Sequence, residues 1–274
     1  MTNPAPLPAV PLTIEGSWVM HQLFRFERPA WNNLDTFHKR KYLQELSVQI
    51  KEWEADEKYP SAIFTMFGHK ADLMIVHFRE DAADLHQAEL DVSRLSIGGV
   101  LRQVHSYTSV VELGLYESSI KTYKSLIERG LTPHSEEWNA EIAATLARQR
   151  EAMAPRLFPT FPDRKYICFY PMDRLRGEKE NWYLESIEER QRMMHDHGMI
   201  GRRYAEDVRQ IITGSIGLDD WEWGVDLFAD DALVFKRLIY EMRFDEVSAK
   251  YAKFGQFFIG VRVPGFALEQ FLIG

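Results

Sequence analysis

The residues best suited to chemistry lie in one stretch, from Met193 to Ser215. His195 and His197 stand two apart there, which on a regular helix separates them by about 200° around the axis. We therefore expect at most one of them to face a pocket, and no zinc site made by the pair. His197 directly precedes Gly198, where we expect the helix to end and the chain to open toward a ligand. Neutral imidazole is a common iron ligand; a histidine that interacts with the last helix carbonyls is the alternative.

A predicted strand from Lys165 to Tyr170 carries a second group that could react. Tyr166, Cys168 and Tyr170 share one face of this strand, because side chains alternate between faces. Tyr170 ends the strand and precedes Pro171, so we expect its phenol at the mouth of a pocket. A tyrosine with its ring in the core and its hydroxyl in water is the alternative.

Gln210 is a lone amide on an apolar strand face that it shares with Val208 and Ile212. Such an amide needs a hydrogen-bond partner, either a ligand or a neighbouring backbone group. Five arginines surround these elements in sequence, and the fork geometry of arginine suits carboxylates. They are Arg156, Arg174, Arg176, Arg202 and Arg203. A ligand with several carboxylates is therefore predicted, with ordinary solvated surface charge as the alternative.

The composition is that of an ordinary globular protein with one large domain or two small ones: 274 residues, 45% hydrophobic and 27% charged. A net charge of −8 argues against nucleic acid or an anionic membrane as partner, since both need clustered Lys and Arg. The single cysteine, Cys168, excludes an internal disulfide and fits a reducing compartment. The N-terminus lacks the pattern of a signal peptide, and no apolar run approaches the ~20 residues of a membrane span. We expect a cytoplasmic protein without a membrane partner.

The predicted elements repeat once along the chain. The first half reads strand (18–26), helix (35–56), hairpin (62–67 and 73–79), helix (82–95) and strand (101–113). The second half reads strand (165–170), helix (186–198, opened by a capping box), hairpin (208–215 and 221–228), helix (232–243) and strand (256–263). This is the split βαβ order of ferredoxin-like units. We predict an α+β fold, a tandem duplication of ferredoxin-like units that forms a dimeric α/β-barrel-like subunit.

The same order sets the predicted domain boundaries. Residues 1–14, rich in Pro and Ala, are expected to form a flexible leader, and residues 15–117 an N-terminal ferredoxin-like domain. Residues 118–164 contain a polar, Ala-rich helix followed by three prolines, and we assign them to a helical connector. Residues 165–274 are expected to form a C-terminal ferredoxin-like domain.

Five motifs together carry a resemblance to a known family. They are Tyr170-Pro-Met172, Asn181-Trp-Tyr183, His197-Gly-Met-Ile-Gly-Arg202, Gly214-Ser-Ile-Gly-Leu-Asp-Asp-Trp-Glu-Trp223 and Tyr240-Glu-Met-Arg-Phe-Asp-Glu-Val-Ser-Ala249. Spaced as they are, they resemble the coproheme decarboxylases, chlorite dismutase-like enzymes of the coproporphyrin-dependent haem pathway. The match is dense from about Arg156 to Arg262, whereas the first half resembles the family in the order of its elements.

The resemblance implies that the C-terminal domain binds iron coproporphyrin III (coproheme), which is both substrate and redox centre. Hydrogen peroxide is then the oxidant, and two propionates become vinyl groups with release of two CO2, leaving haem b. The resemblance also implies a homopentamer, with a coproporphyrin ferrochelatase as the possible upstream donor of the substrate.

Carried onto this chain, the resemblance makes His197 the proximal iron ligand and Tyr170 the redox-active phenol beside the reacting propionate. Gln210 becomes the distal amide above the iron, and Met172 lines the pocket near a reacting group. Where the family often has lysine, this chain has Arg174, which keeps the charge but not the compact ammonium geometry. We count Tyr170, Gln210 and Arg174 as the predicted catalytic residues.

Arg156, Arg202 and Ser248 are the further propionate partners that the resemblance implies. Chlorite dismutases place a cationic arginine distally to manage a small anionic oxidant, so the neutral Gln210 argues against that activity. A chlorite dismutase or haem peroxidase of the same superfamily is nevertheless the first alternative. A non-catalytic haem-binding protein is the second.

Overall fold

The computed structural model of the chain describes residues 7–56 and 58–268. Within these residues the strands form one sheet, and neighbouring strands run antiparallel. The strands are β1 (Thr13–Phe26), β2 (Ser61–Met66), β3 (Leu73–Arg79), β4 (Leu101–Gly114), β5 (Tyr166–Arg174), β6 (Arg209–Gly214), β7 (Trp223–Ala229), β8 (Ala252–Phe254) and β9 (Phe258–Arg262).

The strand pairings close into a ring. Its order is β7-β6-β4-β1-β3-β2-β9-β5, and β5 pairs with β7 again, while β8 pairs with the end of β5. Two pairings join the halves of the chain: β4 with β6, where Val110 lies opposite Gly214, and β2 with β9, where Phe64 lies opposite Arg262. Because each half supplies the neighbour that the other half's edge strands need, neither half closes the sheet alone.

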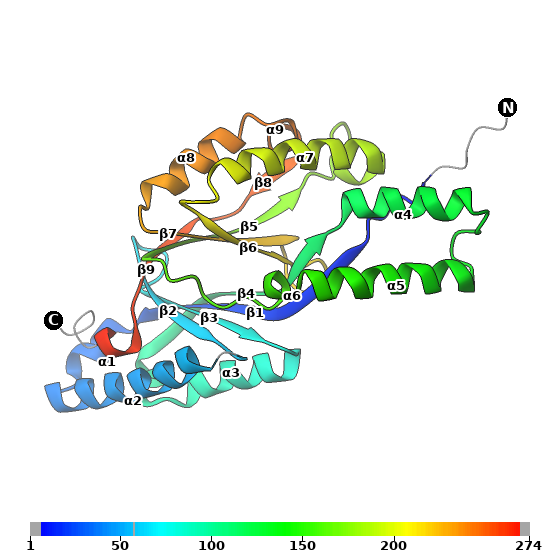
Figure 1. Cartoon of the computed structure of the whole chain (residues 1–274). Helices are drawn as coiled ribbons and strands as arrows, with labels where there is room; N and C mark the ends of the chain where they lie inside the picture. Colours follow the sequence, from blue (N-terminus) through cyan, green and yellow to red (C-terminus); the bar gives the residue numbers. More distant parts are fainter. Residues whose placement is uncertain (1–6, 57, 269–274) are drawn as a thin grey trace.

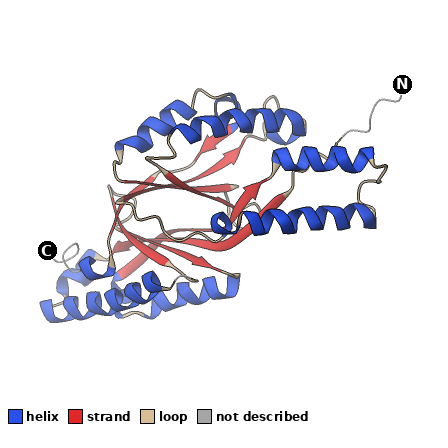
Figure 2. Ribbon diagram, in the orientation of Figure 1, coloured by secondary structure: helices blue, strands red, loops and turns tan. Residues whose placement is uncertain are grey.

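Helices cover the outer side of the ring. They are α1 (Arg28–Asn33), α2 (Thr36–Ala55), α3 (Ala82–Arg94), α4 (Tyr116–Glu128), α5 (Glu136–Ala152), α6 (Ala154–Leu157), α7 (Ile187–Arg203), α8 (Leu233–Met242) and α9 (Glu246–Tyr251), with short 3-10 turns η1 (Ser96–Val100), η2 (Trp182–Leu184) and η3 (Gly265–Ala267). In Figure 1, α2 and α3 lie on the N-terminal half, α7, α8 and α9 lie on the C-terminal half, and α4 and α5 project to one side. Figure 2 shows the strands as a central layer between these helices.

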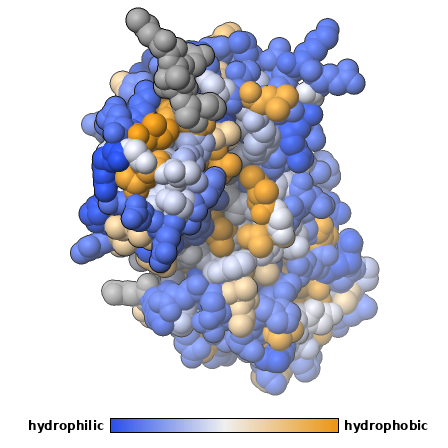
Figure 3. All heavy atoms as spheres, turned by 90° about the vertical axis from the view of Figure 1, so that its right-hand side faces the viewer, coloured by the Kyte–Doolittle hydropathy of each residue, from blue (hydrophilic) through white to orange (hydrophobic). Residues whose placement is uncertain are grey.

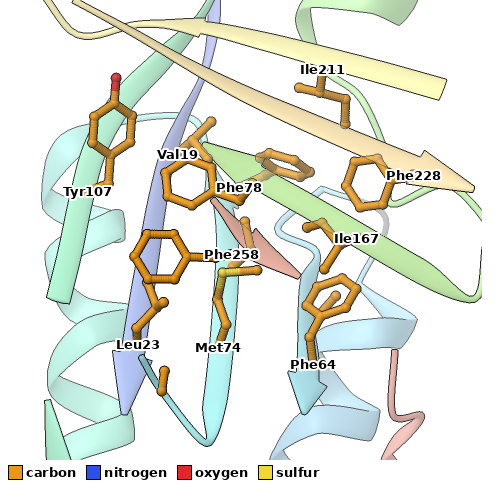
Figure 4. Packing of buried hydrophobic residues seen from close by; sticks show 14 of the residues in the cluster. Val19, Leu23, Phe64, Met74, Phe78, Tyr107, Ile167, Ile211, Phe228 and Phe258 are labelled. Carbon is orange, nitrogen blue, oxygen red and sulfur yellow. The ribbon is translucent and has the colours of Figure 1, made fainter. Parts of the chain in front are cut away.

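The main core lies inside the ring. Aromatic and aliphatic side chains from both halves meet there, among them Phe64, Phe78, Phe169, Phe228 and Phe258. Figure 4 shows how rings and branched side chains from strands of both halves interdigitate in this core. On β5, Ile167 and Phe169 belong to this core, whereas Cys168 and Tyr170 pack on the opposite, helix-covered face.

Local sequence explains the main helices. Asp35 accepts a hydrogen bond from the backbone N–H of His38 at the start of α2, whose stripe of Leu43, Leu46, Ile50 and Trp53 is buried. Ser186 caps α7 by accepting from the backbone N–H of Glu189 at 3.2 Å. The predicted helix start at Ser186 is therefore confirmed.

Several elements differ from the prediction. Strand β5 does not end at Tyr170 but continues through Pro171 to Arg174. Helix α7 does not end at Gly198 but runs to Arg203, because a glycine lowers helix stability without breaking a helix that is packed elsewhere. The described part of the predicted leader, residues 7–14, is not free: Leu7 and Leu12 pack against α4, and β1 begins at Thr13. Residues 1–6 lie outside the described residues. The connector contains a helix, α4, that was not predicted.

The mixed α+β class is confirmed, with a large antiparallel sheet and both runs of strand, helix, hairpin, helix and strand present. The second run also contains α9 and β8, which were not predicted. The domain boundaries stay predictions. Among the described helices, none is both long and apolar enough to span a membrane.

Candidate functional site

A cavity of about 1000 Å³ lies against the outer face of β5, β6 and β7, under α7. It brings together the eight site residues that the resemblance implies. These are Arg156, Tyr170, Met172, Arg174, His197, Arg202, Gln210 and Ser248. Figure 3 views the side of the molecule that carries α4 and α5, where apolar side chains show in a hollow surrounded by hydrophilic surface.

His197 is held by a carboxylate. Its Nδ1 lies 2.8 Å from Oδ2 of Asp245, the residue that caps α9. Asp245 also accepts the backbone N–H of Ser248 at 2.8 Å and the Ser248 hydroxyl at 3.1 Å. Burial opposes ionisation of Asp245, but the hydrogen bonds from His197 and Ser248 outweigh it and hold the pKa of that carboxyl below its usual value.

The ionised Asp245 fixes the tautomer of His197. A carboxylate only accepts hydrogen bonds, so Nδ1 of His197 carries the proton and donates it. Nε2 is then a lone-pair donor, and it makes no hydrogen bond with any described residue. An imidazole oriented in this way through its other nitrogen is the usual arrangement of a metal-bound histidine.

His195 also lines the cavity, from an exposed position on α7. Both histidines therefore line the cavity, so the expectation that at most one of them faces a pocket is wrong. Only His197 has a carboxylate on its ring. Within the described part of the chain, no cluster of three or more His, Cys, Asp or Glu side chains could hold a metal ion.

Tyr170 is buried, with 5% of its surface exposed, and its ring packs on Phe257 at 4.6 Å and Phe254 at 5.7 Å between centroids. Its hydroxyl makes no hydrogen bond to any residue that the structure describes. Burial raises the pKa of this phenol well above its ordinary value, because the phenolate would lose its hydration.

Arg174 lies two residues beyond Met172 on the same face of β5 and is 8% exposed. Its guanidinium stacks on Trp182 at 5.1 Å and Trp223 at 6.0 Å, and Nη2 contacts the sulfur of Met194 at 3.5 Å. Nη1 is buried without a partner, and no acidic side chain in the described residues forms an ion pair with it. Burial lowers the pKa of Arg174, but arginine still keeps its charge in proteins. The cavity thus contains a buried cation without an anion.

Gln210 faces the cavity from β6, together with Ile212, whereas Ile211 points into the core. A Cβ placed on Gly201 of α7 would lie 3.6 Å from Nε2 of Gln210. The amide of Gln210 therefore lies close to α7, the helix that carries His197. The cavity lining thus contains both an imidazole and a neutral amide.

The five clustered arginines divide into two groups. Arg156 and Arg202 line the cavity from exposed positions, as Arg174 does from a buried one. Arg176 and Arg203 lie outside the lining and form ion pairs with Glu222 at 3.5 Å and Glu241 at 2.7 Å. For these last two, the alternative of ordinary surface charge holds.

Sequence reasoning missed several residues of this site. Asp245 stands 48 positions from His197, and only its role as a helix cap has a local pattern, an Asp three residues before Ser248. Arg190 and Tyr116 also line the cavity, from α7 and from the start of α4. Neither stands in a motif, so only the folded chain brings them to the site.

The chain matches known proteins over most of its length. The family model for chlorite dismutase matches residues 39–263. A haem-binding protein from Thermus thermophilus is 36% identical, with a TM-score of 0.83, and the match covers 98% of this chain and 100% of that one. Chlorite dismutase from Candidatus Nitrospira defluvii in complex with imidazole is 17% identical, with a TM-score of 0.69 over 94% of this chain and 95% of that one, a likeness of fold. The chain therefore belongs to the chlorite dismutase family.

Proposed function

We propose that this chain is a peroxide-dependent coproheme decarboxylase, which converts iron coproporphyrin III to haem b by turning two propionates into vinyl groups. The observation that carries the proposal lies on β5. A buried phenol without a hydrogen bond, Tyr170, and a buried guanidinium without an anion, Arg174, stand four residues apart on one face. Both line the cavity of His197. A porphyrin carboxylate that meets the arginine would lie beside the phenol.

The residues present fit an iron porphyrin. His197 would bind the iron through Nε2, which Asp245 leaves free by accepting from Nδ1. The haem-binding relative, similar along the whole chain, supports a haem-type ligand. When bound, the iron together with peroxide supplies the oxidising power that the reaction needs.

The protein's own part in the reaction is positioning. Arg174 would hold one carboxylate of the substrate by charge-assisted hydrogen bonds, so that the carbon chain of that arm lies against Tyr170. Each conversion takes two electrons and one proton from a propionate and releases CO2, and one H2O2 accepts them with a second proton from the solvent and becomes two water molecules. Tyr170 would pass its phenol hydrogen to that oxidant, and a hydrogen atom of the propionate arm would replace it. Burial keeps the phenol hydrogen in place near neutral pH, because it raises the pKa of the phenol.

The side chain of Gln210 favours peroxide over chlorite as the oxidant. Gln210 is neutral, so it offers hydrogen bonds but no charge to hold a small anionic oxidant. Arg156 and Arg202, exposed at the cavity, and Ser248 are proposed to bind the remaining propionates, with Met172 beside a reacting arm.

The test is turnover of coproheme by the purified protein with hydrogen peroxide, followed by mass spectrometry of the porphyrin. We expect two successive losses of CO2, and Tyr170→Phe should bind coproheme but not convert it. Tyr166→Phe is the matched control: Tyr166 lies on the same strand face but not in the cavity lining, so turnover should be unchanged.

Other outcomes would identify the alternatives. Oxygen release from chlorite without conversion of coproheme would favour a chlorite dismutase. Tight haem binding without turnover, indifferent to Tyr170, would favour a haem carrier. A full conversion rate in Tyr170→Phe would contradict the role of the phenol.

The partners belong to the same proposal. We infer a homopentamer from the resemblance to coproheme decarboxylases, and a cytoplasmic ferrochelatase reaction as the source of the substrate. Light scattering of the purified protein tests the assembly, and a mass other than five chains would contradict it.

A further inference from the structure

A second buried arginine lies in the cavity, apart from the residues that the proposed reaction uses. Arg190 of α7 is 4% exposed and lines the cavity. Its Nη2 donates a hydrogen bond to the backbone carbonyl of Ala9, while its Nε is buried without a hydrogen-bond partner. No acidic group among residues 7–56 and 58–268 pairs with it. A buried guanidinium stays charged, and leaving it without an anion is costly unless a ligand supplies one.

The surroundings of Arg190 extend this positive region toward Arg174. Met194, one helical turn after Arg190 on α7, receives the contact from Nη2 of Arg174 at 3.5 Å. Tyr116 lines the same end of the cavity: burial raises the pKa of its phenol, while the charges of Arg190 and Arg174 lower it. The guanidinium of Arg174 lies over the ring of Trp182 at 5.1 Å, and Trp182 meets the ring of Tyr116 edge to face at 6.4 Å between centroids. Two cations and one phenol therefore share this end.

The acidic groups nearby do not neutralise the two arginines. Glu112 lines the cavity, and burial together with the charge of Glu15 raises its pKa, which favours the uncharged form. Glu117 pairs with Lys121 at 2.6 Å on the surface of α4.

Asp245 and Glu222 also act on Arg174 electrostatically, but Asp245 binds His197 at 2.8 Å, and Glu222 pairs with Arg176 at 3.5 Å and accepts the backbone N–H of Arg174. No carboxylate in the described part of the chain forms an ion pair with the guanidinium of Arg174 or Arg190, so a ligand can supply that partner.

We infer that Arg190 and Tyr116 form a second anion subsite, which takes a carboxylate next to the one assigned to Arg174. The inference rests on the proposed function for the identity of the ligand, a porphyrin with four carboxylates. Arg190 has donor nitrogens left for a carboxylate, and the Tyr116 hydroxyl can donate one more hydrogen bond. This subsite makes the cavity select a tetracarboxylate porphyrin over a dicarboxylate one.

The test is equilibrium binding of metal-free porphyrins, followed by quenching of tryptophan fluorescence. Coproporphyrin III has four carboxylates and mesoporphyrin IX has two. Arg190→Met should lower the affinity for coproporphyrin III at least about tenfold, the effect of losing a charge-assisted hydrogen bond. The same variant should change the affinity for mesoporphyrin IX by no more than about twofold. Arg148→Met is the control, since Arg148 is exposed on α5 outside the lining and loses the same charge.

Folding is followed in the same samples. Arg190→Met should melt no lower than the wild type, because it removes an unbalanced buried charge. Should that variant fail to fold, Arg190→Lys and Tyr116→Phe replace it in the test, because each keeps part of the subsite. Each should lower the affinity for coproporphyrin III about threefold or more and leave the affinity for mesoporphyrin IX unchanged.

Two results would overturn the inference: Arg190→Met lowers the affinity for both porphyrins equally, or it does not lower the affinity for coproporphyrin III. Free propionate forms the last arm of the test. If it raised the melting temperature of the wild type but not of Arg190→Met, while both porphyrins bound as before, the subsite would serve a free anion instead. Failure of the proposed function looks different, since selective porphyrin binding would then persist without any conversion of coproheme.

Discussion

Tyr170 has an environment that fixes its protonation state. Burial raises its pKa above the ordinary 10.0, and within the described residues no donor stabilises the phenolate. The phenol therefore keeps its hydrogen at every pH near neutrality. A group that exchanges a hydrogen with a propionate arm needs this property.

An alkaline titration checks that state. From about pH 6 to about pH 10, the phenolate absorbance of the wild type and of Tyr170→Phe should superimpose, because no other tyrosine differs between them. A difference that develops below about pH 9 would mean that Tyr170 ionises, and would contradict its role as a neutral phenol.

Asp245 sets how strongly His197 can donate electrons to a metal ion through Nε2. A carboxylate on Nδ1 makes the imidazole a stronger donor at Nε2, and loss of such a partner typically costs about 10–100-fold in metal affinity or activity. We expect Asp245→Asn to weaken haem binding or turnover in that range and to raise the reduction potential of the bound iron. Spectroelectrochemistry of the loaded protein measures the potential.

The neighbouring Glu246→Gln serves as the control, because it removes one carboxylate that pairs with Lys250 and not with His197. An equal change of reduction potential in both variants would mean that any lost negative charge has this effect, and that the contact with His197 is not needed for it.

The lowered pKa of Asp245 also predicts how the stability of the protein depends on acid pH. Its stabilising effect is complete above the unfolded value near 3.8 and is lost as pH falls through the lower folded value. The difference in melting temperature between wild type and Asp245→Asn should therefore shrink below about pH 4.

Helix α7 is the element that carries the imidazole and the buried Arg190, and its start is fixed by Ser186. Ser186→Ala removes the side chain that accepts the N–H of Glu189. We expect a loss of about 1 kcal/mol in the free energy of unfolding, typical of an N-cap serine, with the spectrum of bound haem unchanged. Urea denaturation measures the first quantity. A shifted haem spectrum at full occupancy would show that the cap also sets the position of His197.

The sequence predicted the elements with strong periodicity and failed where a glycine or a short helix intervened. The buried stripe of α2 and the alternation of β5 are local patterns, so Leu43, Leu46 and Tyr170 were assigned to the correct faces. Helix α7 passes through Gly198 because packing decides whether a glycine ends a helix. Helix α9 has only six residues, too few for a periodic pattern.

His197 and Tyr170 stand in motifs and Gln210 is a lone amide on an apolar strand face, and the fold brings all three to one cavity. Asp245 also stands in a motif, but its contact with His197 has no local pattern. Asp245 and Arg190 act through partners distant in sequence, and their burial exists only in the folded chain. A charge that lacks a partner is a property of three-dimensional packing, so composition and spacing do not reveal it.

The closed ring makes the two halves depend on each other. Inside it, Nε2 of His21 on β1 lies 2.9 Å from Oδ1 of Asp226 on β7, and neither side chain is exposed. This pair joins the N-terminal half to the C-terminal half within the common core. Global stability should therefore respond strongly to its loss.

Asp226→Ala tests this dependence. Removal of one partner of a buried pair typically costs about 3–5 kcal/mol, and we expect a loss of that size in the free energy of unfolding, with one cooperative transition for the whole chain. Asp230→Ala, just after β7, removes an exposed carboxylate that pairs with Arg164 and serves as the control. Separate transitions for the two halves would contradict a single closed ring.

The most direct test of the account is a crystal structure of the protein with iron coproporphyrin III bound. We predict that Nε2 of His197 binds the iron, that Gln210 lies over the opposite face of the porphyrin, and that one propionate lies between Tyr170 and Arg174. An iron bound by any other side chain, or a porphyrin whose propionates all lie away from Tyr170, would contradict the proposed function.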